Sequence, residues 1–111
     1  MSVDPQSLSA QHQETGFLDR ITTVEGVQSR YQVYVPPDFN RSKKWPVILS
    51  LHGSGERGDD GVLPTAIGLG NAIRRHRAFV PAIVVFPQAP LGSLWLGQPE
   101  RVALQALDAA M

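Results

Sequence analysis

Two neighbouring segments in the first third of the chain alternate between apolar and polar residues. The apolar positions of the first are Leu18, Ile21 and Val24. In the second, the apolar Tyr31, Val33 and Val35 alternate with Arg30, Gln32 and the partly polar Tyr34. Gly26 lies between the segments and is a typical turn residue, so residues 17–35 are predicted to form a β-hairpin.

Two later segments are apolar almost without interruption over the length of a strand, at residues 46–51 and 82–86. Strands that are apolar on both faces are typical of the interior of a parallel sheet. Between them lie a glycine-rich turn at residues 53–61 and a segment at 71–77 that suits a short helix. A strand, a crossover helix and a second strand are therefore predicted, and the fold class is α/β.

The last segment of the chain has high helix propensity. Pro99 suits the first turn of a helix, and the negative charge of Glu100 is favourable near the positive end of the helix dipole. Its predicted apolar stripe consists of Ala103, Leu107, Ala110 and Met111. No capping glycine or asparagine and no basic residue follows in the last turn. The pattern predicts a helix that is cut short at the end of the chain.

Composition excludes several classes of protein. The chain has 111 residues, no cysteine, and ten Lys plus Arg against ten Asp plus Glu. A disulfide framework, a thiolate metal site and a cysteine nucleophile are therefore excluded, and the balanced charge argues against a polyanion partner such as nucleic acid. Residues 1–16 are polar, are expected to form a flexible N-terminal arm before a domain at 17–111, and do not resemble a signal peptide. With no apolar run of membrane length, a cytoplasmic protein is expected.

The glycine-rich turn permits more than one interpretation. Residues 53–58 match G-x-G-x-x-G after a strand, which is the pattern of a dinucleotide-binding loop. Asp59, Asp60 and Pro64 follow, and these disfavour both a diphosphate and a helix starting there. Residues 53–58 also match the first part of the P-loop motif, but Asp59 and Asp60 occupy the positions of its Lys and Ser/Thr. A plain surface turn is the structural alternative.

What precedes the glycines favours another interpretation. A strand that runs into His52, Gly53, Ser54 and Gly55 resembles the His-Gly-x-Gly loop that carries the oxyanion hole in α/β-hydrolases. With the hairpin, the crossover, the segment 86–90 and Trp95, residues 17–111 resemble the N-terminal part of the esterase and carboxylesterase branch. Within it, the chain is most similar to predicted peptidases and to polyhydroxybutyrate-depolymerase-like or feruloyl-esterase-like hydrolases. The resemblance implies a sheet truncated before the nucleophile elbow.

The resemblance also implies roles for individual residues. The backbone N–H of Ser54 would stabilise the oxyanion, supported by the loop residues His52, Gly53, Gly55, Glu56 and Arg57. Gln88 and Trp95 would contact a small ester or acyl substrate. Neither a metal nor an organic cofactor is implied. Glu56 and Arg57 are expected to brace the loop by bonding to neighbouring backbone or to each other.

The catalytic triad of such an enzyme is absent from these residues. None of the eight serines lies in G-x-S-x-G, so the chain contains no nucleophile, and the 111 residues alone are expected to be inactive. His12 lies in the polar arm, and His76 lies among the basic residues 74–77, which are expected to form a solvated face. Asp59 and Asp60 have no further ligand at a spacing that would complete a metal site.

Two other functions remain open. The chain could be a small nucleotide-binding module that uses the loop from Gly53 to Gly58, or a non-catalytic half-domain that associates with another chain. By the family topology the strand from Val47 to Leu51 would form an open apolar edge, so self-association through it is expected.

Overall fold

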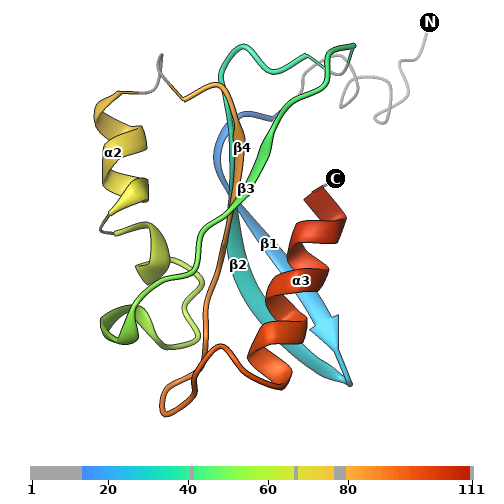
Figure 1. Ribbon diagram of the computed structural model, residues 1–111, viewed down its shortest axis with the longest axis vertical. Coiled ribbons are helices and arrows are strands. Elements are labelled where there is room, and N and C mark those ends of the chain that lie inside the picture. The colour runs from blue at the N-terminus through green and yellow to red at the C-terminus, as the bar shows by residue number, and fades with distance from the viewer. Residues whose placement is uncertain (1–13, 41, 67, 77–79, 111) are drawn as a thin grey trace, which may run out of the picture.

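The computed structural model describes residues 14–40, 42–66, 68–76 and 80–110, and its centre is a four-stranded mixed sheet (Figure 1). The spatial order is β1 (Gly16–Val24), β2 (Val27–Val35), β4 (Ile83–Pro87) and β3 (Val47–Leu49). The first two pairs are antiparallel, whereas β3 and β4 run parallel. The predicted hairpin and the predicted parallel pair are confirmed, and the fold class is α/β.

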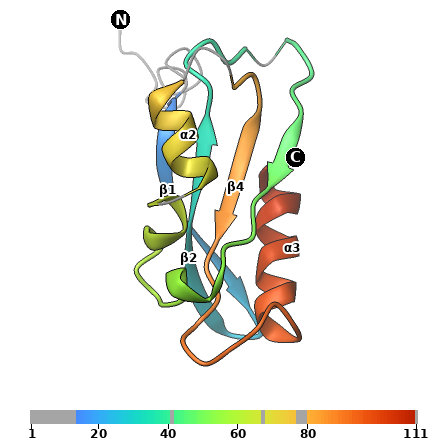
Figure 2. The same cartoon turned by 60° about the vertical axis from the view of Figure 1, so that its left-hand side comes forward.

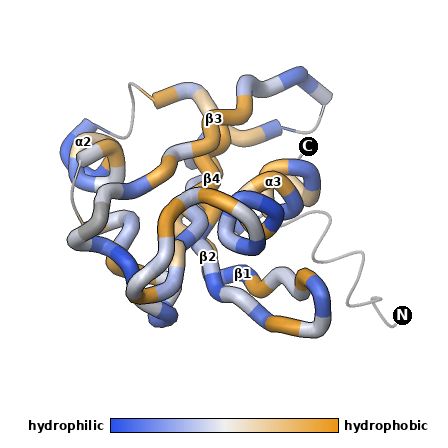
Figure 3. The backbone as a smooth tube through the Cα atoms, turned by 60° about the horizontal axis from the view of Figure 1, so that its bottom comes forward, coloured by the Kyte–Doolittle hydropathy of each residue, from blue (hydrophilic) through white to orange (hydrophobic). Residues whose placement is uncertain are grey.

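Helices cover the two faces of the sheet. The short helix α2 (Leu69–Arg75) lies on one face and α3 (Gln98–Ala110) on the other, which gives three layers (Figure 1). One core cluster lies on the α3 side and contains Tyr31, Val33, Val35, Ile83, Val85 and Ala106. The cluster on the α2 side contains Tyr34, Ile73, Val84 and Phe86. Figure 3 shows the largely apolar β3 and β4 between the two helices.

Strand β2 is more buried than its sequence pattern indicates. Alternation of apolar and polar residues is typical of a strand with one exposed face, but the structure buries every residue from Tyr31 to Val35, including Gln32. The reason is that β2 is a central strand with a helical layer or loop over both faces. Gln32 donates from Nε2 to Asp19 Oδ1 at 3.0 Å, so the buried amide has one polar partner on β1.

The β1–β2 turn contains two residues, Glu25 and Gly26, with φ of 55° and 79°. Positive φ at both positions is the geometry of a type I′ turn, whose twist matches that of the flanking strands. The sequence indicated the glycine and did not indicate the positive φ of Glu25. The carboxylate of Glu25 lies 2.6 Å from Nε of Arg101, so the hairpin tip is connected to the first turn of α3.

Strand β3 is shorter than predicted. The apolar run predicted a strand over 46–51, but only three residues, Val47–Leu49, pair with β4. Ile48 is 41% exposed and Leu51 48%, because β3 is an edge strand in the described part of the chain, where it pairs with β4 alone. On the opposite edge Ile21 of β1 is likewise 59% exposed.

Arg74, in the last turn of α2, has a different environment from the one expected. Arg74 was expected to be solvated, but its guanidinium donates to the carbonyl oxygen and to Oγ1 of Thr65. The same group lies 4.4 Å from the centre of the Phe17 ring, which is a cation–π distance. Arg74 therefore joins α2 to the preceding 3-10 turn and to β1. His76 is exposed, and Arg77 lies outside the described residues.

The predicted final helix is confirmed as α3, but its buried residues differ in part from the predicted apolar stripe. It begins at Gln98, one residue before the predicted start, with Glu100 in its first turn. Its buried residues are Pro99, Val102, Ala103 and Ala106. Leu107 and Ala110, which the sequence assigned to the stripe, are half-buried, and Met111 lies outside the described residues.

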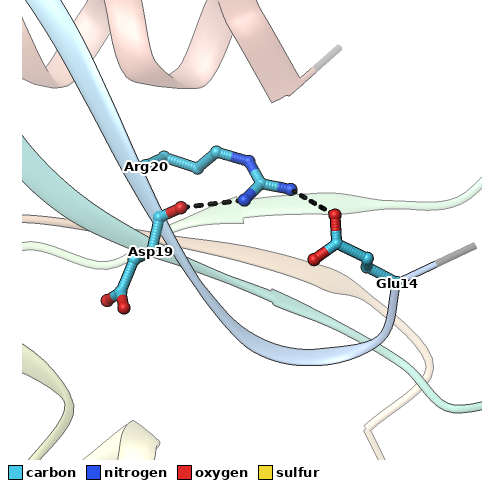
Figure 4. A network of polar contacts seen from close by, with 3 residues as sticks. All are labelled: Glu14, Asp19 and Arg20. Carbon is cyan, nitrogen blue, oxygen red and sulfur yellow. Dashed lines mark hydrogen bonds and ion pairs between the residues drawn. The ribbon is translucent and has the colours of Figure 1, made fainter. Parts of the chain in front are cut away.

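Most of the predicted N-terminal arm, residues 1–13, lies outside the described residues. Where the description begins, Glu14 Oε1 lies 3.9 Å from NH2 of Arg20, and NH1 of Arg20 donates to the Asp19 carbonyl at 2.8 Å (Figure 4). The ion pair is exposed, so it contributes at most about 1 kcal/mol. No helix in the described part of the chain has the length and apolar character needed to cross a membrane.

Candidate functional site

The glycine-rich loop and the loop that follows β4 lie at the same end of the sheet. Parallel strands direct their carboxyl ends to one edge, and both connections leave from that edge of β3 and β4 (Figure 2). Ligands of open α/β sheets bind outside the carboxyl ends of the strands. This end of the molecule is therefore the candidate site.

The first turn of the glycine-rich loop is a short 3-10 helix, η1 (Ser54–Glu56). The Gly53 N–H donates to Oε1 of Glu56 at 3.2 Å, and the Glu56 N–H donates to the Gly53 carbonyl at 3.4 Å. These two bonds close the turn around Ser54, which is its first helical residue. Backbone N–H groups at the start of a helix have no partner within the helix, so the first amides of this turn can donate to a ligand.

His52 connects the two loops. Its Nε2 accepts a hydrogen bond from the Ala89 N–H at 2.9 Å, and its Nδ1 lies 2.5 Å from the Gly53 carbonyl oxygen. This pattern requires a neutral ring with the proton on Nδ1. The ring centre is 4.9 Å from that of Trp95, and Nε1–H of Trp95 donates to the His52 carbonyl at 3.2 Å. Two residues that were singled out in the sequence are therefore in direct contact.

Gln88 follows directly after β4 and is buried. The side chain is 4% exposed, its Nε2 donates to the Glu56 carbonyl at 2.9 Å, and its Oε1 accepts from the Gly61 N–H at 2.6 Å. Both ends of the amide are bonded to the glycine-rich loop. The geometry thus makes Gln88 a brace for that loop, and the substrate contact that the resemblance implies stays a prediction.

Arg57 and Gly58 complete the connection between the loops. NH1 of Arg57 donates to the Ser93 carbonyl at 3.1 Å, and the Gly58 N–H donates to the Ala89 carbonyl at 2.9 Å. Ala89 and Ser93 offer only backbone groups here, so residue type carried no signal for them. Only the expectation that adjacent parallel strands end together could have indicated these contacts.

Asp60 stabilises the second turn of the loop, η2 (Leu63–Thr65). Its Oδ1 accepts hydrogen bonds from the N–H groups of Val62 at 2.7 Å and Leu63 at 3.0 Å. The bond from Leu63, followed by that from Val62, holds the pKa of the Asp60 carboxyl below its ordinary value. A structural role thus accounts for this carboxylate. Among the described residues there is no group of three potential metal ligands.

The dinucleotide alternative is not supported by the local structure. That motif requires an α-helix that opens at its third glycine, which corresponds to Gly58. Here Gly58 lies in a loop with φ of 151°, and the next α-helix begins at Leu69. The pyrophosphate of a dinucleotide would therefore lack the helix N-terminus that normally binds it.

A pocket of about 170 Å³ lies beside Gly53. Its lining residues are His52, Gly53, Arg57, Ala89, Ser93, Leu94 and Trp95. The pocket is small for a ligand site, since such sites are usually several hundred Å³. Residues from both loops line it, and residues from both loops also line a second pocket of about 550 Å³ that includes Gly58 and Gln88.

Comparison with known proteins places this fold beside an esterase. No family model matches the chain, and no curated protein matches it. A solved structure described as that of a thermostable esterase is similar, with a TM-score of 0.70 and 30% sequence identity. The match covers 84% of this chain and 29% of the esterase chain, so the 111 residues span about a third of that protein's length. The chain has a mixed α/β fold like that of part of an esterase.

Proposed function

We propose that the chain is the N-terminal part of a serine-dependent α/β-hydrolase that cleaves carboxylic esters, and that it supplies one backbone donor of the oxyanion hole. The observation that carries the proposal is the esterase-like fold together with the His52–Gly55 loop at the carboxyl end of β3. Attack on an ester carbonyl places negative charge on its oxygen, which N–H donors held in a rigid turn stabilise without rearranging. In this proposal the donor is the Ser54 N–H.

Two glycines in the loop support this assignment. Gly53 has φ of −83°, and a Cβ added to it would meet only Glu56 Oε1 at 3.7 Å, an ordinary contact. A Cβ on Gly55 would meet nothing within 4 Å. Neither backbone conformation nor packing explains glycine at these two positions. Close approach of a substrate to the backbone does explain it.

The remaining groups of the reaction are proposed to come from outside residues 1–111. No serine in the sequence lies in G-x-S-x-G, so the nucleophile, the acid and the base that follow it in this class are not among these residues. The substrate is proposed to be a small ester or acyl compound, bound beside Trp95. We propose no metal or organic cofactor, because a serine mechanism needs neither.

The first experiment is to sequence the source nucleic acid beyond the codon for Met111. A continuing reading frame with G-x-S-x-G, then an acidic residue and a histidine, supports the proposal. A stop codon with no such pattern downstream contradicts it. Hydrolysis of a p-nitrophenyl ester by the 111-residue chain alone, above the rate of a denatured sample, would also contradict it.

In a continuing frame, Ser54→Pro tests the donor itself. Proline lacks the N–H but suits the first position of a helix, and the extended Gly53, with ψ of −175°, is compatible with a following proline. We expect kcat to fall roughly 100- to 1000-fold. Ser54→Ala is the matched control, because it removes the hydroxyl and keeps the N–H, and its kcat should change little. Equal losses in both variants would assign the role to the hydroxyl instead.

A further inference from the structure

The pocket of about 550 Å³ lies between the β1–β2 hairpin and the two loops that follow β3 and β4. It shares no lining residue with the pocket beside Gly53, and none of its lining residues belongs to β3. Its volume is ordinary for a small-molecule site, which usually encloses about 300–1,000 Å³. Its walls are formed by residues 21, 27–30, 58–60, 88, 90 and 98.

Donor groups of Arg30 and Gln98, which both line this pocket, have no partner in the described part of the chain. The Arg30 guanidinium, on β2, makes no hydrogen bond and no ion pair there. Nε2 of Gln98, at the first residue of α3, is buried without a hydrogen bond, and a turn of the amide about its last bond brings this donor to the pocket. A guanidinium matches a carboxylate in shape and charge, so this wall favours a ligand with a carboxylate.

The glycine-rich loop supplies the opposite charge. Asp59 lines the pocket, is exposed, and has no hydrogen bond or ion pair among the described residues. Asp60 lines it too, but its Oδ1 already accepts two backbone N–H groups. A free carboxylate accepts hydrogen bonds and attracts a cation, so Asp59 favours an ammonium group. A ligand that satisfies both walls therefore carries a carboxylate and an ammonium group.

Main-chain groups of β2 are unpaired at this pocket. Strand β2 pairs with β1 over its whole length, but its pairing with β4 ends at Tyr31 and Pro87. The two-residue turn makes Val24 and Val27 a hydrogen-bonded pair, so the even-numbered residues of β2 direct their N–H and C=O groups away from β1. Gln28 lies beyond the end of β4, and its N–H and C=O have no partner within the described residues. Free groups of this kind bind an extended peptide backbone.

Apolar side chains also line this space. Ile21 and Val27 belong to the lining and are 59% and 53% exposed. An inorganic anion would leave them uncovered and would be repelled by Asp59, and a metal cation would be repelled by Arg30. An apolar side chain of a peptide covers this surface, and its removal from water is favourable. The pocket thus has a contact for each part of a peptide.

We propose that this pocket binds a short peptide with free termini. The C-terminal carboxylate bonds to the guanidinium of Arg30 and to the amide of Gln98, and the N-terminal ammonium lies at Asp59. An amide group of the peptide pairs with the main chain of Gln28, as in the addition of a strand to a sheet. The site lies on the β2 side of β4, so its walls are formed without any residue of β3.

Alanyl-leucine is the probe, because it carries both charged termini, one peptide group and an apolar side chain. The dipeptide is titrated into the isotope-labelled chain, and the amide chemical shifts are followed by NMR. We expect the largest shifts at Gln28, Asp59 and Gln98. A ligand of this size with ordinary efficiency per atom binds with a dissociation constant of about 1 mM.

Blocked peptides and single variants test the contact of each charge. N-acetyl-alanyl-leucine lacks the ammonium and alanyl-leucinamide lacks the carboxylate, so each is expected to bind roughly tenfold more weakly. Arg30→Gln should weaken the binding of alanyl-leucine by a similar factor and leave that of alanyl-leucinamide unchanged. Asp59→Asn should weaken the binding of alanyl-leucine and leave that of N-acetyl-alanyl-leucine unchanged.

Arg20→Gln and Asp38→Asn are the matched controls. Both residues are exposed, and neither lines the pocket. Arg20 lies on the sheet face opposite to that of Arg30, because Arg20 is paired with Tyr31, the residue that follows Arg30 in β2. Both control variants should bind alanyl-leucine as the unaltered chain does. The amide spectrum shows whether each variant folds, and the blocked peptides test the proposal without any substitution.

Several outcomes would overturn the proposal. They are unchanged amide shifts at tens of millimolar peptide, equal affinity for the three peptides, and equal losses in Arg30→Gln and Arg20→Gln. Shifts confined to residues 52–57 would place the peptide in the other pocket and would also contradict it. The result does not depend on the proposed catalytic function, because the two pockets share no lining residue.

Discussion

Residues 53–55 and 58–61 of the loop are both rich in glycine, but glycine serves different purposes in the two parts. Gly61 has φ of 73°, and a Cβ there would lie 2.7 Å from Cβ of Arg30, closer than such atoms pack. The conformation and packing of the chain therefore require glycine at this position. At Gly53 and Gly55 neither requirement exists. One sequence motif thus contains a part in which the structure requires glycine and a part in which neither backbone conformation nor packing requires it.

The largest expected effect on stability is that of Gly61→Ala. The substitution combines left-handed strain with a clash against Arg30, and we expect the free energy of unfolding to fall by about 3 kcal/mol. Urea denaturation at a fixed protein concentration measures it. A loss below about 1 kcal/mol would show that the second part of the loop relaxes easily, which would remove the distinction between the two parts.

Gln88→Ala extends the comparison, because it removes the side chain that holds residues 58–61 in place. It leaves the Gly61 N–H and the Glu56 carbonyl without their partner, and we expect a loss of about 2 kcal/mol. The matched control is Gln105→Ala, which breaks an exposed hydrogen bond to Thr23 and should cost no more than about 0.5 kcal/mol. Similar losses in the two variants would contradict a special role for Gln88.

A smaller effect is expected at low pH. The hydrogen bonds from Leu63 and Val62 lower the pKa of Asp60, so its contribution to stability is complete above the ordinary value of 3.8. That contribution disappears as the pH falls through the lower pKa of the folded state. In Asp60→Asn the amide oxygen can still accept both bonds, and this part of the acid dependence should be absent. Identical acid titrations of stability in the two proteins would contradict the assignment.

Gly55→Ala should have the smallest effect. An added Cβ meets nothing within 4 Å, and alanine restricts the unfolded chain, so the free energy of unfolding should change by less than about 0.5 kcal/mol or rise slightly. Thermal unfolding of Gly55→Ala and Gly61→Ala under the same conditions compares the two stability changes. A destabilisation as large as that of Gly61→Ala would place Gly55 in the part of the loop that requires glycine.

The elements whose local patterns are strong could be predicted from the sequence. Alternation around Gly26 indicated the hairpin, the apolar run at 82–86 indicated β4, and helix propensity after Pro99 indicated α3. The glycine-rich loop could be predicted for the same reason, because its glycines lie close together in the sequence. Predictions about exposure were weaker, as Gln32 and Arg74 show. Both residues are polar and have partners on other elements, which no local pattern reveals.

By itself, the sequence determined which segments become strands, turns and helices, and it determined the absence of a cysteine and of a G-x-S-x-G serine. Only the tertiary structure decided that His52 meets Ala89 and Trp95, that Gln88 braces the loop, and that β4 lies between β2 and β3. The physical reason is that strand order and strand direction bring together segments 27 to 43 residues apart in the sequence. Hydrogen bonds between such segments depend on backbone positions, and residue type carries little information about those positions.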